Sequence, residues 1–190
     1  MGRKKYTRII PKGIREGYIE KPTDEEMDII QMAADSIIPF DGGRNYLVKL
    51  LKGSNAKIMK RNNAQDNDYY GTLKYLKMKD IERRVDWMIE KGWLKLVQPW
   101  KQPIIRHTEK GWKKAKKLWA DKLVKQMEEN LNAFLEGIKN KNHEIKHELL
   151  DKIQEDKITS LAAALMGWRK IGVRKVRKKI NAIFRDWEQN

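Results

Sequence analysis

The sequence contains no cysteine. The chain therefore has no disulfide, no thiolate nucleophile and no cysteine-ligated zinc or iron–sulfur site. It also has no apolar run long enough to span a bilayer, and its basic start, Met1 to Tyr6, is not followed by the apolar core of a signal peptide. We therefore expect a cytoplasmic protein, nucleoid-associated if bacterial, with no membrane partner.

Acidic residues are few relative to basic ones. The chain has 26 Asp and Glu against 42 Lys and Arg, which gives a formal net charge of +16 and a pI of about 9.8. A polyanion gains affinity for such a protein by releasing condensed counterions, whereas a small neutral substrate gains nothing. A nucleic acid is thus the favoured partner; a merely basic protein, or one that binds RNA or the ribosome, fits the same charge.

The first 22 residues predict a basic arm that becomes ordered on a partner. They carry seven basic and two acidic residues, and prolines and glycines interrupt any regular element. A helix is then expected from Thr23 to Pro39, because Thr23 as N-cap and Glu26 three residues later form a capping-box pattern. With 40% hydrophobic residues and seven tryptophans, the rest of the chain has the material for a packed core.

The spacing of apolar residues predicts two further helices and a hairpin. The helices are a short one over 46–51, ending at Gly53, and a longer one over 78–91, stopped by Gly92. Strands are expected at 93–97 and 104–108, and the intervening prolines hold their connection open as a projecting wing. Three helices followed by a hairpin is the order of a winged helix-turn-helix. The fold class is thus mainly α with a small β-hairpin wing.

Beyond residue 118 the sequence predicts a helical extension. The apolar stripes comprise Leu123, Met127, Leu131, Phe134, Leu135 and Ile138; then Ile145, Leu149, Leu150 and Ile153; and, after a break at Gly172, Val173, Val176, Ile180, Ile183, Phe184 and Trp187. Such stripes pack helices on each other or on a second copy, so a homodimer is one expectation. The last helix also carries uncompensated basic residues, which favour a phosphate-binding surface over a solvated face or a membrane-surface helix.

Several segments together resemble a known family. In order they are Gly43-Arg44-Asn45-Tyr46-Leu47, Leu51-Lys52-Gly53-Ser54-Asn55, Tyr70-Gly71-Thr72-Leu73-Lys74, Ile89-Glu90-Lys91-Gly92-Trp93-Leu94 and His107-Thr108-Glu109-Lys110-Gly111. Over about residues 24–117 they resemble the RQC domain, the winged helix that follows the motor of RecQ-family helicases. The phosphate-binding loop of that motor, Gly-x-x-x-x-Gly-Lys-Ser/Thr, and the family's zinc-binding cysteines are absent from the sequence. The resemblance therefore implies a stand-alone, non-catalytic DNA-binding module.

The resemblance also implies positions for the DNA contacts. The phosphate grip falls on Lys52, Ser54, Asn55 and Lys74, and the wedge at the wing tip falls on Trp100, with Lys101 beside it. From the residues alone, we add the basic segment and the C-terminal helix, as Lys57, Lys60, Arg61, Arg174, Lys175 and Lys178. The expected domains are a basic arm (1–22), an RQC-like winged helix (23–117) and a helical extension with a basic last helix (118–190).

One motif points to another class of protein. His143-Glu144-Ile145-Lys146-His147 fits H-E-x-x-H, in which two histidines bind zinc and the glutamate activates water. A charged residue inside the motif, an exposed surrounding helix and the lack of an evident third ligand argue against a zinc metallopeptidase. We expect no metal and no cofactor.

Two functions therefore remain in competition. The first is recognition of structured DNA, meaning duplex ends, forks or junctions, with a helicase or nuclease as possible partner and a role in repair or replication. The second is a sequence-specific transcription regulator that dimerises through its C-terminal helices and reads bases with the helix around Lys79 to Lys91.

Overall fold

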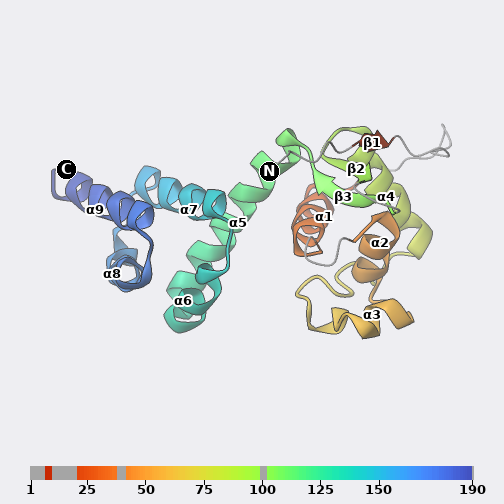
Figure 1. Cartoon of the computed structure of the whole chain (residues 1–190), viewed down its shortest axis with the longest axis horizontal. Coiled ribbons are helices and arrows are strands. Elements are labelled where there is room, and N and C mark those ends of the chain that lie inside the picture. The colour runs from red at the N-terminus through yellow and green to blue at the C-terminus, as the bar shows by residue number, and fades with distance from the viewer. Residues whose placement is uncertain (1–6, 10–20, 38–41, 99–101, 190) are drawn as a thin grey trace. The chain divides into compact units, whose positions relative to one another are not determined.

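A computed structural model describes residues 7–9, 21–37, 42–98 and 102–189. The chain forms two compact units, Met1–Ala115 and Lys116–Asn190, and the boundary falls within one helix, α5 (Glu109–Glu129). Figure 1 shows the elements of both units.

The N-terminal unit has the predicted order of three helices followed by a hairpin. Its elements are β1 (Thr7–Ile9), α1 (Asp24–Ser36), α2 (Arg44–Lys52), the one-turn α3 (Lys57–Arg61), a 3-10 turn (Ala64–Asp66), α4 (Met78–Glu90), β2 (Leu94–Gln98) and β3 (Ile104–His107). The mainly α fold with a small β wing is confirmed.

Local capping sets the ends of these helices. At the start of α1 the amide of Glu26 donates to Thr23 Oγ1 at 3.2 Å, and the amide of Thr23 donates to Glu26 Oε2 at 2.8 Å. This is the predicted capping box. At the other ends, Gly53 after α2 and Gly92 after α4 have φ of 72° and 70°, in the left-handed region where a side chain is strained.

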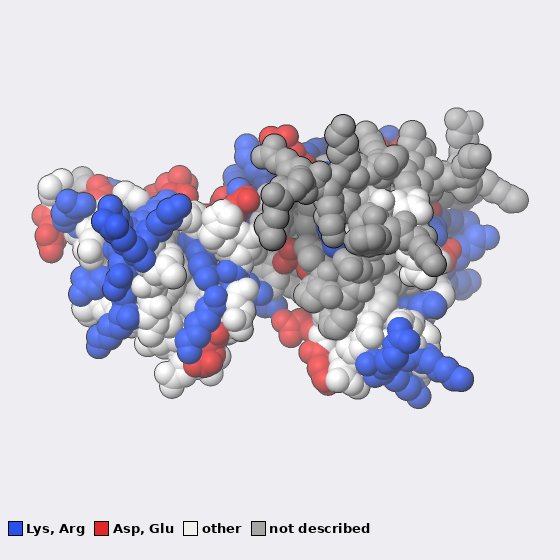
Figure 2. All heavy atoms as spheres, viewed as in Figure 1, with Lys and Arg blue, Asp and Glu red and all other residues white. Residues whose placement is uncertain are grey.

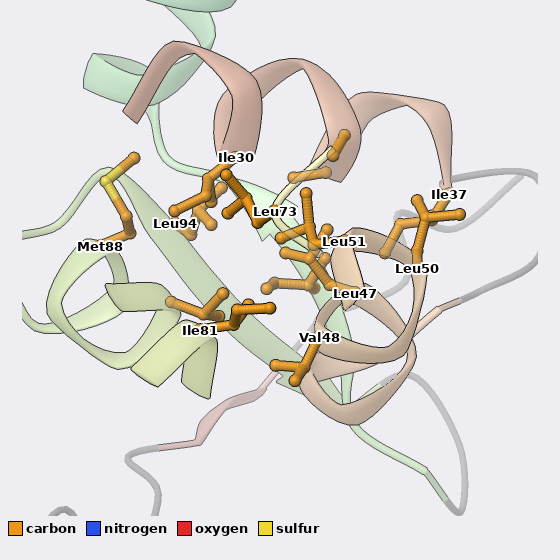
Figure 3. Close-up of a cluster of buried hydrophobic side chains, with 14 of the residues drawn as sticks. Ile30, Ile37, Leu47, Val48, Leu50, Leu51, Leu73, Ile81, Met88 and Leu94 are labelled. Atoms are coloured by element: carbon orange, nitrogen blue, oxygen red, sulfur yellow. The ribbon is translucent and has the colours of Figure 1, made fainter. Parts of the chain in front are cut away.

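The core of this unit lies between α1, α2, α4 and the sheet (Figure 3). Its fully buried side chains include Ile30 of α1, Leu47 of α2, Ile81 of α4 and Leu94 of β2. Leu73 is also fully buried, although it belongs to the turn between α3 and α4. Burying an aliphatic side chain contributes about 1.5–3 kcal/mol. Leu73 therefore anchors an otherwise polar turn to the core.

The sheet has three antiparallel strands in the order β1-β2-β3. Val97 pairs with Ile104, as the predicted hairpin requires, and Gln98 extends β2 by one residue beyond the prediction by pairing with Thr7. The expectation that no regular element forms before Pro22 is wrong, because Thr7–Ile9 pairs with β2, with Arg8 opposite Val97. β-branched Thr7 and Ile9 favour a strand, and the edge of β2 offers free hydrogen-bonding groups.

The C-terminal unit is helical, as predicted. It contains the rest of α5, α6 (Leu131–Lys139), α7 (His143–Glu155), a 3-10 turn (Thr159–Leu161), α8 (Ala162–Ile171) and α9 (Arg174–Gln189). The apolar stripes of α7 and α9 are buried at Ile145, Leu149, Leu150 and Ile153, and at Val176, Ile180 and Ile183. Among the described residues, no helix is long and apolar enough to cross a bilayer.

Two details of this unit differ from the predicted stripes. The stripe expected over 123–138 spans two helices, because Asn130 caps α6 by accepting a hydrogen bond from the amide of Ala133 at 3.0 Å. The break at Gly172 is confirmed. Phe134 of α6 packs edge-on against Trp168 of α8, with ring centres 5.5 Å apart.

Candidate nucleic-acid interface

The end of α2 and the turn at 70–76 are joined through their backbones. The amide of Gly71 donates to the carbonyl of Leu50, and that of Leu73 donates to Leu51, both at 2.9 Å. A Cβ on Gly53 would lie 3.0 Å from the Cα of Gly71, so glycine permits this close approach. The two motifs, separated by 14 residues in the sequence, therefore form one surface.

Lys52 ties this surface together. Its Nζ donates to the carbonyls of Lys74 and Leu76, at 2.6 and 2.7 Å. Tyr70 adds a further tie, because its hydroxyl donates to the carbonyl of Ser54 at 3.1 Å. Two of the three N–H groups of the Lys52 ammonium thus hold protein backbone, which leaves one for a phosphate.

Ser54 and Asn55 connect α2 to α3. The Ser54 hydroxyl accepts a hydrogen bond from the amide of Ala56 at 3.3 Å, just before the first turn of α3. Ser54 is half-buried, whereas Asn55 is exposed. Of the pair, Asn55 offers the more accessible donor.

The other predicted cations of this unit lie on its surface. Lys57, Lys60, Arg61 and Lys74 are exposed, and none of them forms an ion pair with a residue that the structure describes. Figure 2 shows a dense group of Lys and Arg side chains in the region of α3, at the lower right. Residues 49–61 contain five basic side chains and no acidic one, so the local field is positive.

Sequence reasoning did not assign two cations near this surface to phosphate binding. Lys77 and Lys79 are exposed, and Lys77 follows Leu76, whose carbonyl holds Lys52. The signal was present, since residues 69–79 contain no acidic residue.

Helix α4, the recognition helix of a helix-turn-helix, has a different electrostatic character. It carries three Lys and Arg against four Asp and Glu. Arg84 pairs with Glu26 at 2.9 Å and Arg83 with Asp80 at 3.2 Å, while Asp86 binds Arg44. Most of its cations are thus committed inside the protein, and α4 is poorly suited to contact phosphates or bases.

The Glu26–Arg84 pair is held in its charged form. Burial alone would raise the pKa of Glu26, but hydrogen bonds from Arg84 and from the Thr23 amide outweigh burial and lower that pKa. Tyr75 also donates to Glu26 at 3.2 Å. These bonds fix α1 to α4 and position the 70–76 turn between them.

The base of the wing is fixed to the start of α2. The amide of Ile105 donates to the carbonyl of Gly42 at 2.9 Å, and a Cβ on Gly43 would lie 2.5 Å from the carbonyl oxygen of Pro103. The predicted wedge residues, Trp100 and Lys101, lie outside the described residues.

Helix α9 presents the second predicted basic surface. Arg174, Lys175 and Lys178 are exposed and form no ion pair within the described part of the chain. Lys179 differs, because it pairs with Asp151 of α7. The opposite side of α9 is buried, so the predicted division between an apolar and a basic face is present.

The H-E-x-x-H motif occupies the first turns of α7. Its Glu144 lies 3.5 Å from Lys116, in an ion pair. No group of three or more His, Asp or Glu side chains suited to a metal occurs in the ranges that the structure describes. The motif therefore gains no third ligand from the fold.

Comparison with known proteins places this fold in a family. Searches of curated proteins and of solved structures found no match. The family model of the RQC domain matches residues 28–130, more than half of the chain. The match includes α1 from Asp28 onward, α2 to α4, the hairpin and the whole of α5. An RQC domain is a winged helix that binds DNA and is not itself catalytic. The chain therefore belongs to the RQC-domain family.

Proposed function

We propose that this protein recognises structured DNA, namely duplex ends, forks or junctions, through phosphate contacts and the wing, without catalysis. One observation carries the proposal. The ties between α2 and the 70–76 turn hold a cationic surface, called here the α3 face, made of Asn55, Lys57, Lys60, Arg61, Lys74 and Lys77.

The α3 face favours recognition of DNA shape over base sequence. Its cations are exposed and lie on short, rigidly tied segments, as phosphate contacts require. Base reading through the major groove would instead need a helix of donors, and α4 is acidic on balance. This charge distribution favours the structured-DNA proposal over the transcription regulator.

The wing supplies the preference for ends. Trp100 and Lys101 stand in the loop between Val97 and Ile104, which are paired, so the strands define where the loop emerges. An aromatic ring stacked on an unpaired base contributes about 1–3 kcal/mol. We propose that Trp100 stacks on the terminal base and that Lys101 contacts the neighbouring phosphate.

The direct test measures binding of the whole chain to a matched set of oligonucleotides at two salt concentrations. The set contains duplex, fork, four-way junction, single strand and RNA duplex, all with one arbitrary sequence. Tighter binding to forks, ends or junctions supports the proposal. Equal, salt-sensitive binding to all of them contradicts it, and a single preferred palindrome would establish the regulator instead.

Neutralising α3 tests the face itself. Changing Lys57, Lys60 and Arg61 together to Gln should weaken binding to every duplex form. It should also reduce the slope of log affinity against log salt by up to about 2.7, at 0.9 for each lost contact. The matched control changes the exposed Lys113, Lys117 and Lys125 of α5 to Gln, which removes the same charge elsewhere. If both variants lost the same DNA affinity, the α3 face would contribute no more than the overall positive charge of the chain.

Trp100→Ala tests the wing separately. It should weaken binding to forks and ends by roughly tenfold, consistent with about 1–3 kcal/mol of stacking. Binding to the interior of a closed duplex should change little. The measurement compares a hairpin-closed duplex with an open one of the same sequence. An equal loss on both substrates would rule out the wedge.

A further inference from the structure

The turn between α8 and α9 exposes aliphatic side chains within a basic stretch of the sequence, and the proposed α3 face gives it no role. Its residues, Ile171, Gly172 and Val173, are called here the 171–173 turn. Val173 is 66% exposed and Ile171 is 47% exposed, which makes them two of the most exposed large aliphatic side chains in the described chain. They stand in the middle of residues 157–185, a run with nine basic residues and no acidic one.

The backbone fixes this turn tightly. The amide of Gly172 donates to the carbonyl of Trp168 at 2.8 Å. A Cβ on Gly172 would lie 3.0 Å from both that carbonyl oxygen and Val176 Cγ1. A side chain at this position would crowd both helices, which favours glycine at their junction, where Ile171 and Val173 are exposed.

Three features of the sequence at this turn lower local stability: the N-cap residue, the charges at the start of α9 and an exposed aliphatic side chain. The carbonyl of Val173 accepts the first helical hydrogen bond of α9, from Arg177 at 3.0 Å, so Val173 is the N-cap. Valine is among the poorest N-caps, because it cannot accept a hydrogen bond from the first free amides. Arg174 and Lys175 place positive charge at the positive end of the helix dipole, where acids are favoured. Exposure of an aliphatic side chain is the third.

Features that cost local stability are expected where a sequence serves function. Cations lie on both sides of the turn: Arg169 and Lys170 end α8, and Arg174, Lys175 and Arg177 begin α9. Arg169 is also held beside α9, because it donates to Asn181 Oδ1 at 3.1 Å. In the part of Figure 2 where α8 and α9 lie, Lys and Arg side chains gather around uncharged atoms. Along the chain, two exposed aliphatic side chains thus lie between the cations that end α8 and those that begin α9.

We infer that the 171–173 turn enters the minor groove of duplex DNA, with the cations of α8 and α9 against the phosphates of the two strands. The minor groove is about 6 Å wide and is flanked by a phosphate row on each side. Proteins that bind it combine basic side chains with inserted apolar side chains, among them Ile, Leu, Met and Phe. This inference rests on the proposed binding to DNA and adds a second contact of a different kind.

A lipid surface fits the turn less well. Membrane-surface helices bury bulky side chains such as Trp, Phe and Leu along their length. Here Trp168 is only 2% exposed and packs against Phe134, so it is unavailable to lipid. The exposed aliphatic side chains of the turn are only Ile171 and Val173, and residues 157–185 around them contain no acidic residue.

The test uses the whole chain and the variant Val173→Ser. Serine is a better N-cap than valine, so the thermal midpoint should stay equal or rise, which separates binding from folding. Affinity for an A·T-rich duplex should fall about fivefold, from the loss of one buried aliphatic side chain, with the salt slope unchanged. Met166→Ser on α8 is the control, since Met166 is 48% exposed but lies outside the turn.

A competitor that fills A·T minor grooves gives a second readout. It should reduce the affinity of the wild-type chain to that of Val173→Ser and leave the variant unchanged. Wild-type affinity in Val173→Ser, or an equal loss in Met166→Ser, would overturn the inference. The inference would also be overturned if Val173→Ser weakened binding only to anionic phospholipid vesicles and not to DNA. If Val173→Ser weakens binding while the α3 variant does not, the proposed function fails and the minor-groove contact stands; the reverse result removes the minor-groove contact alone.

Discussion

At the scale of single residues, His107 shows how burial changes chemistry. Burial, and secondarily the charge of Arg106, lower the pKa of His107 from its usual 6.5 to about 4. Its ring lies 5.8 Å from that of Trp112, and neither ring nitrogen has a hydrogen-bond partner within the described structure. The side chain is thus a neutral packing residue at neutral pH.

This lowered pKa predicts a loss of stability in mild acid. Between pH 6.5 and about 4 the unfolded chain takes up a proton that the folded chain does not, so the free energy of unfolding falls as the pH falls. The loss should reach at most about 3 kcal/mol at pH 4 and should not grow below it. Denaturant titrations of His107→Phe should lack this component, whereas His143→Phe, at an exposed position, should retain it.

Lys52 and Lys74 make a second contrast at this scale. Lys52 is half-buried and donates to two carbonyls, whereas Lys74 is exposed. Lys52→Met should lower the free energy of unfolding by about 1–2 kcal/mol, because charge-assisted hydrogen bonds are lost. Lys74→Gln should leave stability unchanged and reduce the salt slope of DNA binding by about 0.9. Equal stability of the two variants in urea would show that the ties to Lys52 contribute nothing.

At the scale of elements, much of the fold follows from local signals in the sequence. The capping box at Thr23, the left-handed Gly92 and the prolines around the wing each act within a few residues, and they predict where α1 begins, α4 ends and the hairpin projects. Where a partner is distant in the sequence, local signals fail. The pairing of β1 with β2 depends on a strand some 90 residues away.

The residues of the candidate site can likewise be divided into those that local sequence predicts and those that depend on distant contacts. Exposed cations could be chosen from composition alone, as with Lys57 and Lys60. The hydrogen bonds from Lys52 to two backbone carbonyls could not be predicted, because they depend on how the 70–76 turn folds back on α2. The sequence analysis did not predict that α5 ends before Asn130. The helical spacing of apolar residues continues across this position, and the role of Asn130 as the N-cap of α6 is visible only in the structure.

At the scale of the whole molecule, both units are positive. Residues 1–115 carry 25 Lys and Arg against 15 Asp and Glu, and residues 116–190 carry 17 against 11. Within the second unit the charge is uneven, since residues 157–185 contain no acidic residue, whereas α7 contains four. Each unit therefore has a basic surface of its own, and we propose that each contacts DNA.

Two basic surfaces on one chain should make affinity depend on DNA length. On a long duplex, changing Arg174, Lys175 and Lys178 to Gln should reduce the salt slope by up to about 2.7. On a duplex too short to occupy both surfaces, the same variant should bind like the wild type, because the second contact has no site. Titrations over a series of duplex lengths measure this. A variant effect that is independent of length would show that both surfaces share one short segment.

The contact between Gly53 and Gly71 constrains how this surface can diverge. Both residues have a φ of 72°, but a Cβ on Gly71 would meet Gly53 only at 3.6 Å, whereas one on Gly53 would press on Gly71 at 3.0 Å. Asparagine tolerates that backbone conformation better than most residues. Among descendants of a common ancestor, Asn should therefore replace the second glycine before the first. The first glycine should be the slower-evolving of the two, although glycine has no side chain with which to contact DNA.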